Sequence, residues 1–342
     1  MTIPSHSRPV VAVTLGDPAG IGPELTAKLL AGSEPSETAT VVLVGDPWLW
    51  QDGQQIAGVS VETRPIESFG EARKTFSSVP LFLSMDTVEK ASVTRGQVGA
   101  SCGASVLKVL SCCLDAAVGG SIDAICFAPL NKASMKQGGL RFEDELHFFA
   151  DYLKVEGYCC EFNTLGNLWT SRLSSHIPFQ EASRYVTGER IAEAAKLTHR
   201  SLQEAGFAMP RIAIAALNPH GGDNGSCGRE EIEIMAPAIA ALNAEGVHVD
   251  GPFPADTIFL KARDGFYDAI VTLYHDQGQI AIKLMGFERG VSVQGGLPIP
   301  ITTPAHGTAF DIVGQGKARV DATLSAFRLA ARMGAARHAV AG

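Results

Sequence analysis

Three histidines each end a run of residues that has the pattern of a buried β-strand. They are His176, His220 and His275. Ligands of open α/β sheets collect at the carboxyl ends of strands, and imidazole is the commonest nitrogen ligand of divalent metals. Three histidines at equivalent strand ends therefore predict one facial metal site with coordination positions left open for a substrate. The alternative is that each is a core or turn residue that binds nothing.

Several other side chains near these strand ends could support chemistry at a metal. Lys132 follows another apolar run, and a lysine desolvated near a metal can act as an acid or base. Asp276 and Lys283 follow His275. Lys132, Lys283 and Asp276 are therefore the candidate catalytic residues, although a solvated surface role would also explain a lone lysine. Cys227, in the glycine-rich loop after His220, is a candidate fourth ligand.

Two loops have the composition of ligand-binding turns. The first, Gly16-Asp-Pro-Ala-Gly-Ile-Gly-Pro-Glu24, follows an apolar run and opens a helix, so its glycines and the helix N-terminus would suit an anion. It lacks the dinucleotide fingerprint, and a structural tight turn explains it equally well. The second, His306-Gly-Thr-Ala-Phe-Asp311, leads into a final helix.

The elements that must position these residues alternate between strand and helix patterns, which predicts an α/β fold with mostly parallel sheets. Expected strands cover 10–15, 40–45 and 122–128. Expected helices begin at Gly22 and cover 104–118, 142–153, 188–205, 230–244 and 320–334. The Gly/Pro-rich stretch 286–304 is expected to be an irregular crossing.

Length and composition restrict the class of protein. With 342 residues, two lobes are expected. The net charge of −8 and the lack of basic runs argue against nucleic acid as a partner. No signal peptide and no apolar segment long enough to span a membrane are expected. Seven cysteines, two pairs of them adjacent, indicate free thiols in a reducing cytoplasm.

Five motifs together resemble the PdxA family, the 4-hydroxythreonine-4-phosphate dehydrogenases, over essentially the whole chain. They occur in the family's order and at about its spacing. They are Gly16-Asp-Pro-Ala-Gly-Ile-Gly-Pro-Glu24, Leu217-Asn-Pro-His220, Gly251-Pro-Phe-Pro-Ala-Asp-Thr257, Tyr274-His-Asp-Gln-Gly278 and His306-Gly-Thr-Ala309. The last segment also looks like the adenosine-binding loop of isopropylmalate and isocitrate dehydrogenases, whose two-lobed α/β/α fold the family shares.

The resemblance implies a homodimer that uses NAD or NADP and a divalent metal (Zn, Co, Ni, Mn or Mg). It implies a discontinuous cofactor-side lobe, 1–129 plus 284–342, and a metal, substrate and dimerisation lobe, 130–283. By matching positions the metal ligands are His176, His220 and His275, with one donated across the dimer interface. The implied chemistry is oxidation of a secondary alcohol followed by loss of an adjacent carboxylate. The candidate cofactor-binding residues are Asp17, Gly20, Gly22, His306, Gly307 and Asp311.

The chain departs from the family in its substrate pocket. The family's substrate-binding His-Thr pair corresponds here to Glu145 and Leu146, its asparagine to Ser292 and its arginine to Ile301, whereas Lys283 matches a family lysine. Loss of the arginine and gain of a carboxylate would weaken binding of a phosphate by about 2–5 kcal/mol. We therefore expect a hydroxy-acid substrate other than 4-hydroxythreonine 4-phosphate.

Three alternatives remain open from the sequence. Arg172 could replace the lost arginine, because strand alternation would put it on the same face as His176. The chain would then be a genuine 4-hydroxythreonine-4-phosphate dehydrogenase. Outside this class, it could be a non-catalytic ligand-binding paralogue or an acyltransferase-like protein.

Overall fold

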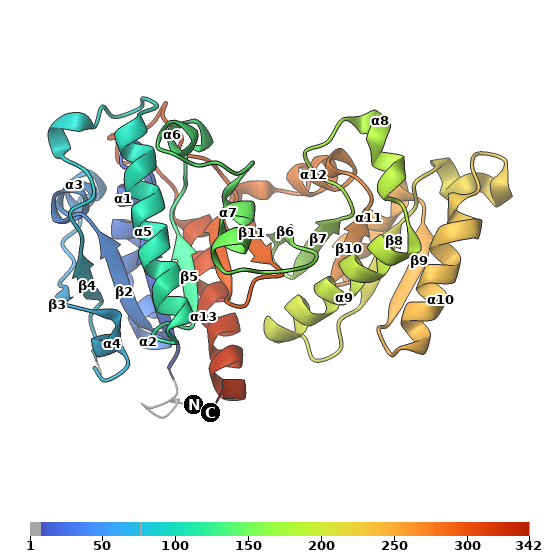
Figure 1. The fold of residues 1–342 in the computed structure, drawn as a ribbon, viewed down its shortest axis with the longest axis horizontal. Helices are drawn as coiled ribbons and strands as arrows, with labels where there is room; N and C mark the ends of the chain where they lie inside the picture. Colours follow the sequence, from blue (N-terminus) through green and yellow to red (C-terminus); the bar gives the residue numbers. More distant parts are fainter. Residues whose placement is uncertain (1–7, 76, 342) are drawn as a thin grey trace. The chain divides into compact units, whose positions relative to one another are not determined.

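The computed structural model describes residues 8–75 and 77–341, and it divides into two compact units. Unit 1 comprises Met1–Glu156 and Leu297–Gly342, and unit 2 comprises Gly157–Gly296 (Figure 1). Unit 1 is discontinuous in sequence, and both boundaries fall later than positions 129 and 283, where the resemblance places them. They fall later because α6 (Lys132–Gln137) packs against α5 (Ala100–Val118) of unit 1, and because β11 (Val291–Gly295) pairs with β6 (Cys160–Leu165) of unit 2.

Unit 1 is built on a parallel sheet with the strand order β3-β4-β2-β1-β5-β12. Its strands are β1 (Val10–Thr14), β2 (Thr40–Gly45), β3 (Arg64–Ile66), β4 (Leu81–Ser84), β5 (Ala124–Phe127) and β12 (Ile301–Pro304). Its remaining helices are α1 (Gly22–Leu30), α2 (Glu34–Thr38), α3 (Pro47–Ala57), α4 (Phe69–Ala72), η1 (Lys90–Ser92), α7 (Glu145–Tyr152) and α13 (Asp321–Ala341).

The long helix α5 belongs to the core of unit 1. Val106, Val109 and Leu110 pack with strand residues such as Val42 and Ile125 in one apolar cluster, and Figure 1 shows the helix lying along these strands. By length and composition alone α5 could cross a membrane, although Lys108 and Asp115 interrupt its apolar sequence. Half of its 18-residue apolar window is nevertheless buried inside the protein, as in core helices.

Unit 2 contains a mixed sheet with the order β11-β6-β7-β10-β8-β9. The strand β6 is antiparallel to both of its neighbours, β11 and β7, whereas β7, β10, β8 and β9 run parallel to one another. The remaining strands are β7 (Leu168–Arg172), β8 (Ile212–Ala215), β9 (Val249–Phe253) and β10 (Ala269–Thr272).

Helices lie on both faces of this second sheet. On one face Ser171 of β7 shares a hydrogen bond with Thr198 of α9, and on the other Asn163 of β6 accepts one from Gln279 of α12. The helices are α8 (Phe179–Ala182), η2 (Ser183–Tyr185), α9 (Gly188–Glu204), η3 (Pro219–Gly225), η4 (Glu231–Met235), α10 (Ala236–Ala244), α11 (Ala255–Arg263), α12 (His275–Leu284) and η5 (Phe287–Arg289).

The expected elements agree with the structure except in two places. The stretch 286–304 contains two strands, β11 and β12, rather than only an irregular crossing. The helix expected over 230–244 begins as a π-helical turn, η4, before α10 continues it. The two strands form by pairing with partners distant in sequence, β6 and β5, since the Gly/Pro content of 286–304 gives no local strand signal.

Candidate metal and active site

The three histidines follow three parallel neighbouring strands of unit 2, as the sequence predicts. His176, His220 and His275 come after β7, β8 and β10, and every residue of these strands is buried. Because β10 pairs in parallel with both β7 and β8, the carboxyl ends of the three strands meet at one edge of the sheet. The order of the strands thus brings three histidine-bearing loops to that edge.

His176 and His275 are adjacent because their loops leave the sheet together. The ladder between β7 and β10 continues past the strand ends, with the Leu173 amide donating to Thr272 at 3.0 Å and the Ser174 amide to Leu273 at 3.2 Å. The two imidazole rings follow with centroids 5.7 Å apart. These two side chains form the centre of the candidate site.

Asp276 orients the ring of His275. Its carboxylate oxygen lies 2.7 Å from His275 Nδ1. A carboxylate at Nδ1 holds the imidazole tautomer in which Nε2 carries the free lone pair, the arrangement of metal-binding histidines. The donor chemistry of this pair therefore fits a divalent metal, with His275 Nε2 as a ligand atom.

Gln277 ties the start of α12 to the loop that carries His220. Its side-chain oxygen accepts from the Leu273 amide, and its nitrogen donates to the Ala216 carbonyl, each at 2.8 Å. The buried Glu231 holds the same loop by accepting from the amides of Leu217 and Asn218 at 2.8 and 2.7 Å. These bonds give a structural reason for the Tyr-His-Asp-Gln-Gly and Leu-Asn-Pro-His motifs.

His220 itself lies in an unusual backbone segment. It begins a run of five residues with left-handed backbone angles, from His220 to Asn224. Among the described residues, no group of ligand atoms within 4.8 Å of one another contains all three histidines, and none contains the exposed Cys227. The binding of one metal by all three histidines, and the role of Cys227 as a fourth ligand, therefore stay predictions.

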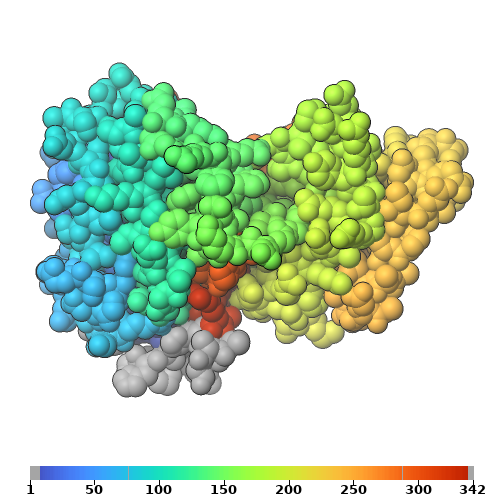
Figure 2. Space-filling model, viewed as in Figure 1, coloured from blue at the N-terminus to red at the C-terminus, as the bar shows by residue number. Residues whose placement is uncertain are grey.

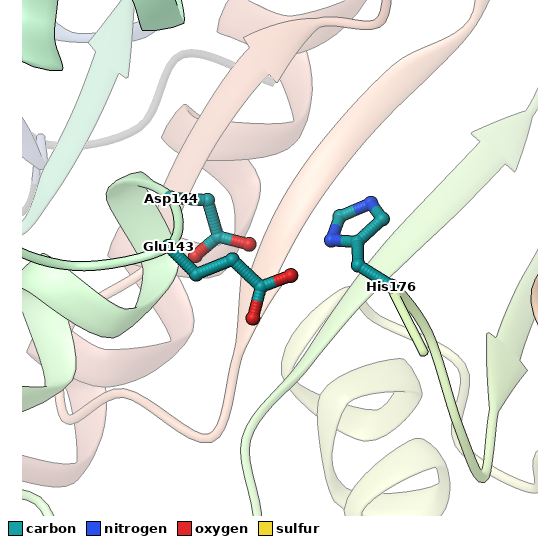
Figure 3. A group of neighbouring side chains, drawn as sticks. All are labelled: Glu143, Asp144 and His176. Carbon is teal, nitrogen blue, oxygen red and sulfur yellow. The ribbon is translucent and has the colours of Figure 1, made fainter. Parts of the chain in front are cut away.

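Figure 3 labels His176 together with Glu143 and Asp144. His176 belongs to the loop after β7 of unit 2, whereas the two acidic residues precede α7 of unit 1, where Asp144 caps the helix by accepting from the His147 amide at 3.1 Å. Burial alone would raise the pKa of Asp144, but hydrogen bonds from His147 and the charges of His147 and Lys132 lower it. Lys132, the first residue of α6, therefore lies near enough to Asp144 for its charge to favour the ionised carboxylate.

The glycine-rich loop after β1 packs against its own protein. A Cβ on Gly22 would lie 2.2 Å from the Leu15 carbonyl oxygen, and one on Gly20 would lie 2.8 Å from Thr308 Cβ. Asp17 is fully buried; burial raises its pKa, and hydrogen bonds from Ala19 and Ser134 partly offset this. Close packing thus explains these glycines without a ligand, and cofactor contact at Asp17, Gly20 and Gly22 stays a prediction.

The second candidate cofactor loop is more open. A Cβ on Gly307 would meet nothing within 4 Å, and Asp311 is exposed. His306 Nδ1 lies 3.1 Å from the Gly307 carbonyl oxygen. This loop has room for a ligand that the Gly16–Glu24 loop lacks.

The predicted substrate residues occupy very different environments. Leu146 is buried on α7, and Ile301 is fully buried in β12, where it pairs with Ile125 of β5. Glu145 begins α7, and Lys283 is exposed in the last turn of α12. Ser292 is buried in β11, with its hydroxyl 3.1 Å from the Asn163 amide nitrogen.

Arg172 does not share a strand face with His176, so that prediction is wrong. The strand β7 ends at Arg172, and His176 lies beyond it in a loop, so alternation no longer relates them. The buried Arg172 guanidinium donates to the Glu161 carbonyl oxygen at 2.9 Å and to Asn163 Oδ1 at 2.5 Å. It is thus bound to β6 within unit 2 and does not replace the lost arginine as an unpaired cation.

Sequence reasoning missed the polar partners of Arg172. They are Glu161 and Asn163 of β6; Asn163 also accepts a hydrogen bond from Gln279 of α12, and Gln294 of β11 lies opposite Glu161 in the strand ladder. The sequence does contain a signal for a polar face. Glu161 and Asn163 are separated by one apolar residue, and so are Ser292 and Gln294. Polar residues repeated on one face of a strand indicate that this face contacts something polar.

Comparison with known proteins identifies the class of enzyme. A solved 4-hydroxythreonine-4-phosphate dehydrogenase from Klebsiella pneumoniae has a TM-score of 0.82 and 33% identity, and the match covers 96% of this chain and 98% of that one. The α/β fold and this likeness define an NAD(P)-dependent oxidoreductase that acts on a CH–OH group.

The family follows from sequence matches over the same region. The pyridoxal phosphate biosynthetic protein PdxA family matches residues 37–330, and the chain belongs to this family. A Pseudomonas aeruginosa relative named "Putative 4-hydroxythreonine-4-phosphate dehydrogenase 2" is 50% identical, over 96% of this chain and 98% of its own. A "Putative D-threonate 4-phosphate dehydrogenase" from Symbiobacterium thermophilum is 34% identical over the same shares. Membership favours the dehydrogenase over the acyltransferase-like alternative.

Proposed function

We propose that the chain oxidises the secondary alcohol of a hydroxy acid with NAD or NADP as the hydride acceptor, that the adjacent carboxylate leaves as CO2, and that the substrate is not 4-hydroxythreonine 4-phosphate. The observation that carries the substrate part is the position of Ile301. Where the resembling family has an arginine, this chain has an apolar side chain fully buried in a strand. A phosphate dianion needs charged donors, and this position supplies none.

The metal part of the proposal rests on the donor set of unit 2. His176, His275 and His220 would hold a divalent ion (Zn, Co, Ni, Mn or Mg), with Asp276 holding the His275 ring. When bound, such an ion stabilises negative charge on the substrate oxygen, and the nicotinamide of NAD or NADP takes the hydride. Lys132 and Lys283 are the proposed proton-transfer residues, and the open loop from His306 to Asp311 is the proposed adenosine contact.

A homodimer is part of the proposal and is supported by an exposed apolar surface beside His275. On α12 the side chains of Ile280 and Leu284 lie one turn apart and are 59% and 84% exposed. Phe179 of α8 is 74% exposed and packs its ring 5.2 Å from that of Tyr274; α8 lies at the surface of unit 2 in Figure 2 (yellow-green). Covering these side chains would favour association with a second copy.

The genuine 4-hydroxythreonine-4-phosphate dehydrogenase is the second candidate, because the Pseudomonas relative at 50% identity carries that name. A cytoplasmic location is also proposed. It is supported by the cysteines, all seven of which are free in the described part of the chain, as in reducing compartments.

A substrate comparison tests the function. The purified protein would be supplied with Zn, Co, Ni, Mn or Mg and with NAD or NADP, and reduction of the cofactor followed at 340 nm. The compared substrates are 4-hydroxythreonine 4-phosphate, D-threonate 4-phosphate and D-threonate. We expect metal-dependent turnover of a threonate substrate with kcat/KM at least about tenfold above that of 4-hydroxythreonine 4-phosphate, equivalent to about 1.4 kcal/mol. Efficient turnover of 4-hydroxythreonine 4-phosphate would establish the second candidate instead.

A further inference from the structure

One face of the sheet in unit 2 carries a cluster of polar side chains that the proposed chemistry does not use. In the ladder between β6 and β11, Ser292 lies opposite Asn163 and Gln294 lies opposite Glu161. Because side chains two residues apart share a face, all four lie on the same face of the sheet. Gln279 reaches this face from α12. The cluster is thus built from two strands and one helix.

Arg172 fixes the orientation of the amide at the centre of this cluster. A guanidinium can only donate hydrogen bonds, so the 2.5 Å contact from Arg172 makes Asn163 Oδ1 an acceptor. Gln279 Nε2 donates to the same oxygen. The Asn163 nitrogen must then face the other way, where it donates to Ser292 Oγ at 3.1 Å.

This orientation decides what Ser292 can offer. Because its oxygen accepts from Asn163, its hydroxyl hydrogen is available to donate in another direction. The charge of Arg172 is balanced by the Glu161 carboxylate, 3.6 Å away. The cluster therefore presents a hydroxyl donor without a net positive charge.

Two glutamine side chains in the cluster carry buried polar atoms for which the described residues provide no partner. Gln294 is 2% exposed, and neither its amide nitrogen nor its amide oxygen has a hydrogen-bond partner among the described residues. Gln279 is 8% exposed, and its Oε1 likewise has none in the described part of the chain. Folded proteins rarely leave such atoms unpaired, because an unmade buried hydrogen bond is costly. These atoms are therefore suited to a polar ligand.

We propose that Gln294, Gln279 and Ser292 form a subsite for an uncharged hydroxyl group of the substrate, so that the preferred substrate is an unphosphorylated polyhydroxy acid. This inference rests on the proposed function and narrows its substrate class. A hydroxyl group both donates and accepts hydrogen bonds. It can therefore pair with the amide of Gln294, with the side-chain oxygen of Gln279 and with the hydroxyl of Ser292. A phosphate, which only accepts, would face the unpaired Gln279 oxygen and the Glu161 carboxylate.

The position of the subsite on α12 supports this assignment. Gln279 and Lys283 are four residues apart, so they lie on the same side of the helix, one turn from each other. Lys283 is the proposed substrate lysine and would pair with the carboxylate of the acid. A molecule with a carboxylate at one end and a hydroxyl at the other fits these two groups.

Thermal unfolding tests the subsite without any need for turnover. The full-length protein would be heated alone and with D-threonate, L-threonate, D-erythronate, L-erythronate or D-threonate 4-phosphate. The variant Gln294→Met keeps the length of the side chain and removes its polar atoms, and Gln294→Leu is the second choice if it does not fold. Gln203→Leu, on the exposed surface of α9, is the matched control.

We expect at least one unphosphorylated acid to raise the Tm of the wild type and of the control. In Gln294→Met this shift should disappear, with the apparent Kd raised at least about tenfold, while the ligand-free Tm stays equal or rises because an unpaired amide has been removed. The inference is overturned if no unphosphorylated acid shifts the wild type, or if the shift survives in Gln294→Met. It is also overturned if only D-threonate 4-phosphate stabilises the protein.

Failure of the subsite and failure of the proposed function are distinguishable. Turnover of a threonate substrate that Gln294→Met leaves unchanged would reject the subsite and keep the dehydrogenase. Binding of an unphosphorylated acid that depends on Gln294, without reduction of NAD or NADP under any metal, would keep the subsite and reject the proposed reaction.

Discussion

At the scale of residues, the candidate metal site depends on how individual imidazoles are oriented. His275 is held by Asp276 at 2.7 Å, and its ring lies beside that of His176. A carboxylate that fixes the tautomer of a ligating histidine also increases its basicity as a ligand. In the proposed site Asp276 would therefore position the candidate metal ligand His275 rather than act as an independent acid or base.

This role predicts a graded loss of metal binding. Asp276→Asn should lower the affinity for the divalent ion about 10–100-fold, and His275→Ala should lower it further, since a ligand atom is lost. Metal affinity would be measured by isothermal titration calorimetry on metal-free protein. His248→Ala, an exposed histidine of unit 2, is the control and should bind like the wild type. Equal affinities of His275→Ala and the wild type would rule out this histidine as a ligand.

At the scale of elements, the contact between α5 and α6 places Lys132. The two helices touch at glycines: a Cβ on Gly103 of α5 would lie 1.8 Å from the Ser134 carbonyl oxygen of α6. Asn131 caps α6 by accepting from the Ser134 amide at 2.9 Å. Since backbone cannot give way as a flexible side chain can, the glycine sets the distance between the helices and the position of the Lys132 end of α6.

We therefore expect Gly103→Ala to displace α6 and to lower the free energy of unfolding by about 1–3 kcal/mol, the usual range for overpacking. Urea denaturation followed by circular dichroism measures this effect. Gly70→Ala is the control, because its nearest neighbour, Ser68 Oγ, would lie 3.7 Å from the new Cβ. A Gly103→Ala variant as stable as Gly70→Ala would contradict the tight packing.

At the scale of the whole molecule, the proposed homodimer makes the exposed apolar surface of α8 and α12 an interface. Apolar side chains as exposed as Phe179 and Leu284 favour association when they gather on one surface. The resemblance implies that one metal ligand comes from the second chain, and on the proposed function assembly and metal binding would then be coupled.

Charge introduced on this surface should separate the chains. Leu284→Glu is expected to shift the protein from dimer to monomer in sedimentation velocity, because burial of an unpaired carboxylate is unfavourable. Met209→Glu is the matched control, since Met209 is 80% exposed in unit 2 and lies outside the α8 and α12 surface. A Leu284→Glu protein that remains dimeric would place the interface elsewhere.

The sequence by itself determined the features that depend on local pattern. Buried strands such as β2 and β10 are mostly apolar, and helices such as α9 begin after a capping residue, Thr187, so their positions could be predicted. The histidines could be located at strand ends for the same reason. The five motifs fixed the family without any structure.

Only the tertiary structure decided which of these residues share an environment. Gly20 and Gly22 have the composition of an anion-binding turn but pack against Thr308 and Leu15. Arg172 looked free to bind substrate but is bound to Asn163, which in turn contacts Ser292, 129 residues later in the chain. Hydrogen bonds between residues so far apart follow from strand order and register, which no local pattern specifies. The candidate metal ligands could therefore be proposed from their positions alone, whereas the polar cluster of Gln279, Ser292 and Gln294 became visible only in the folded chain.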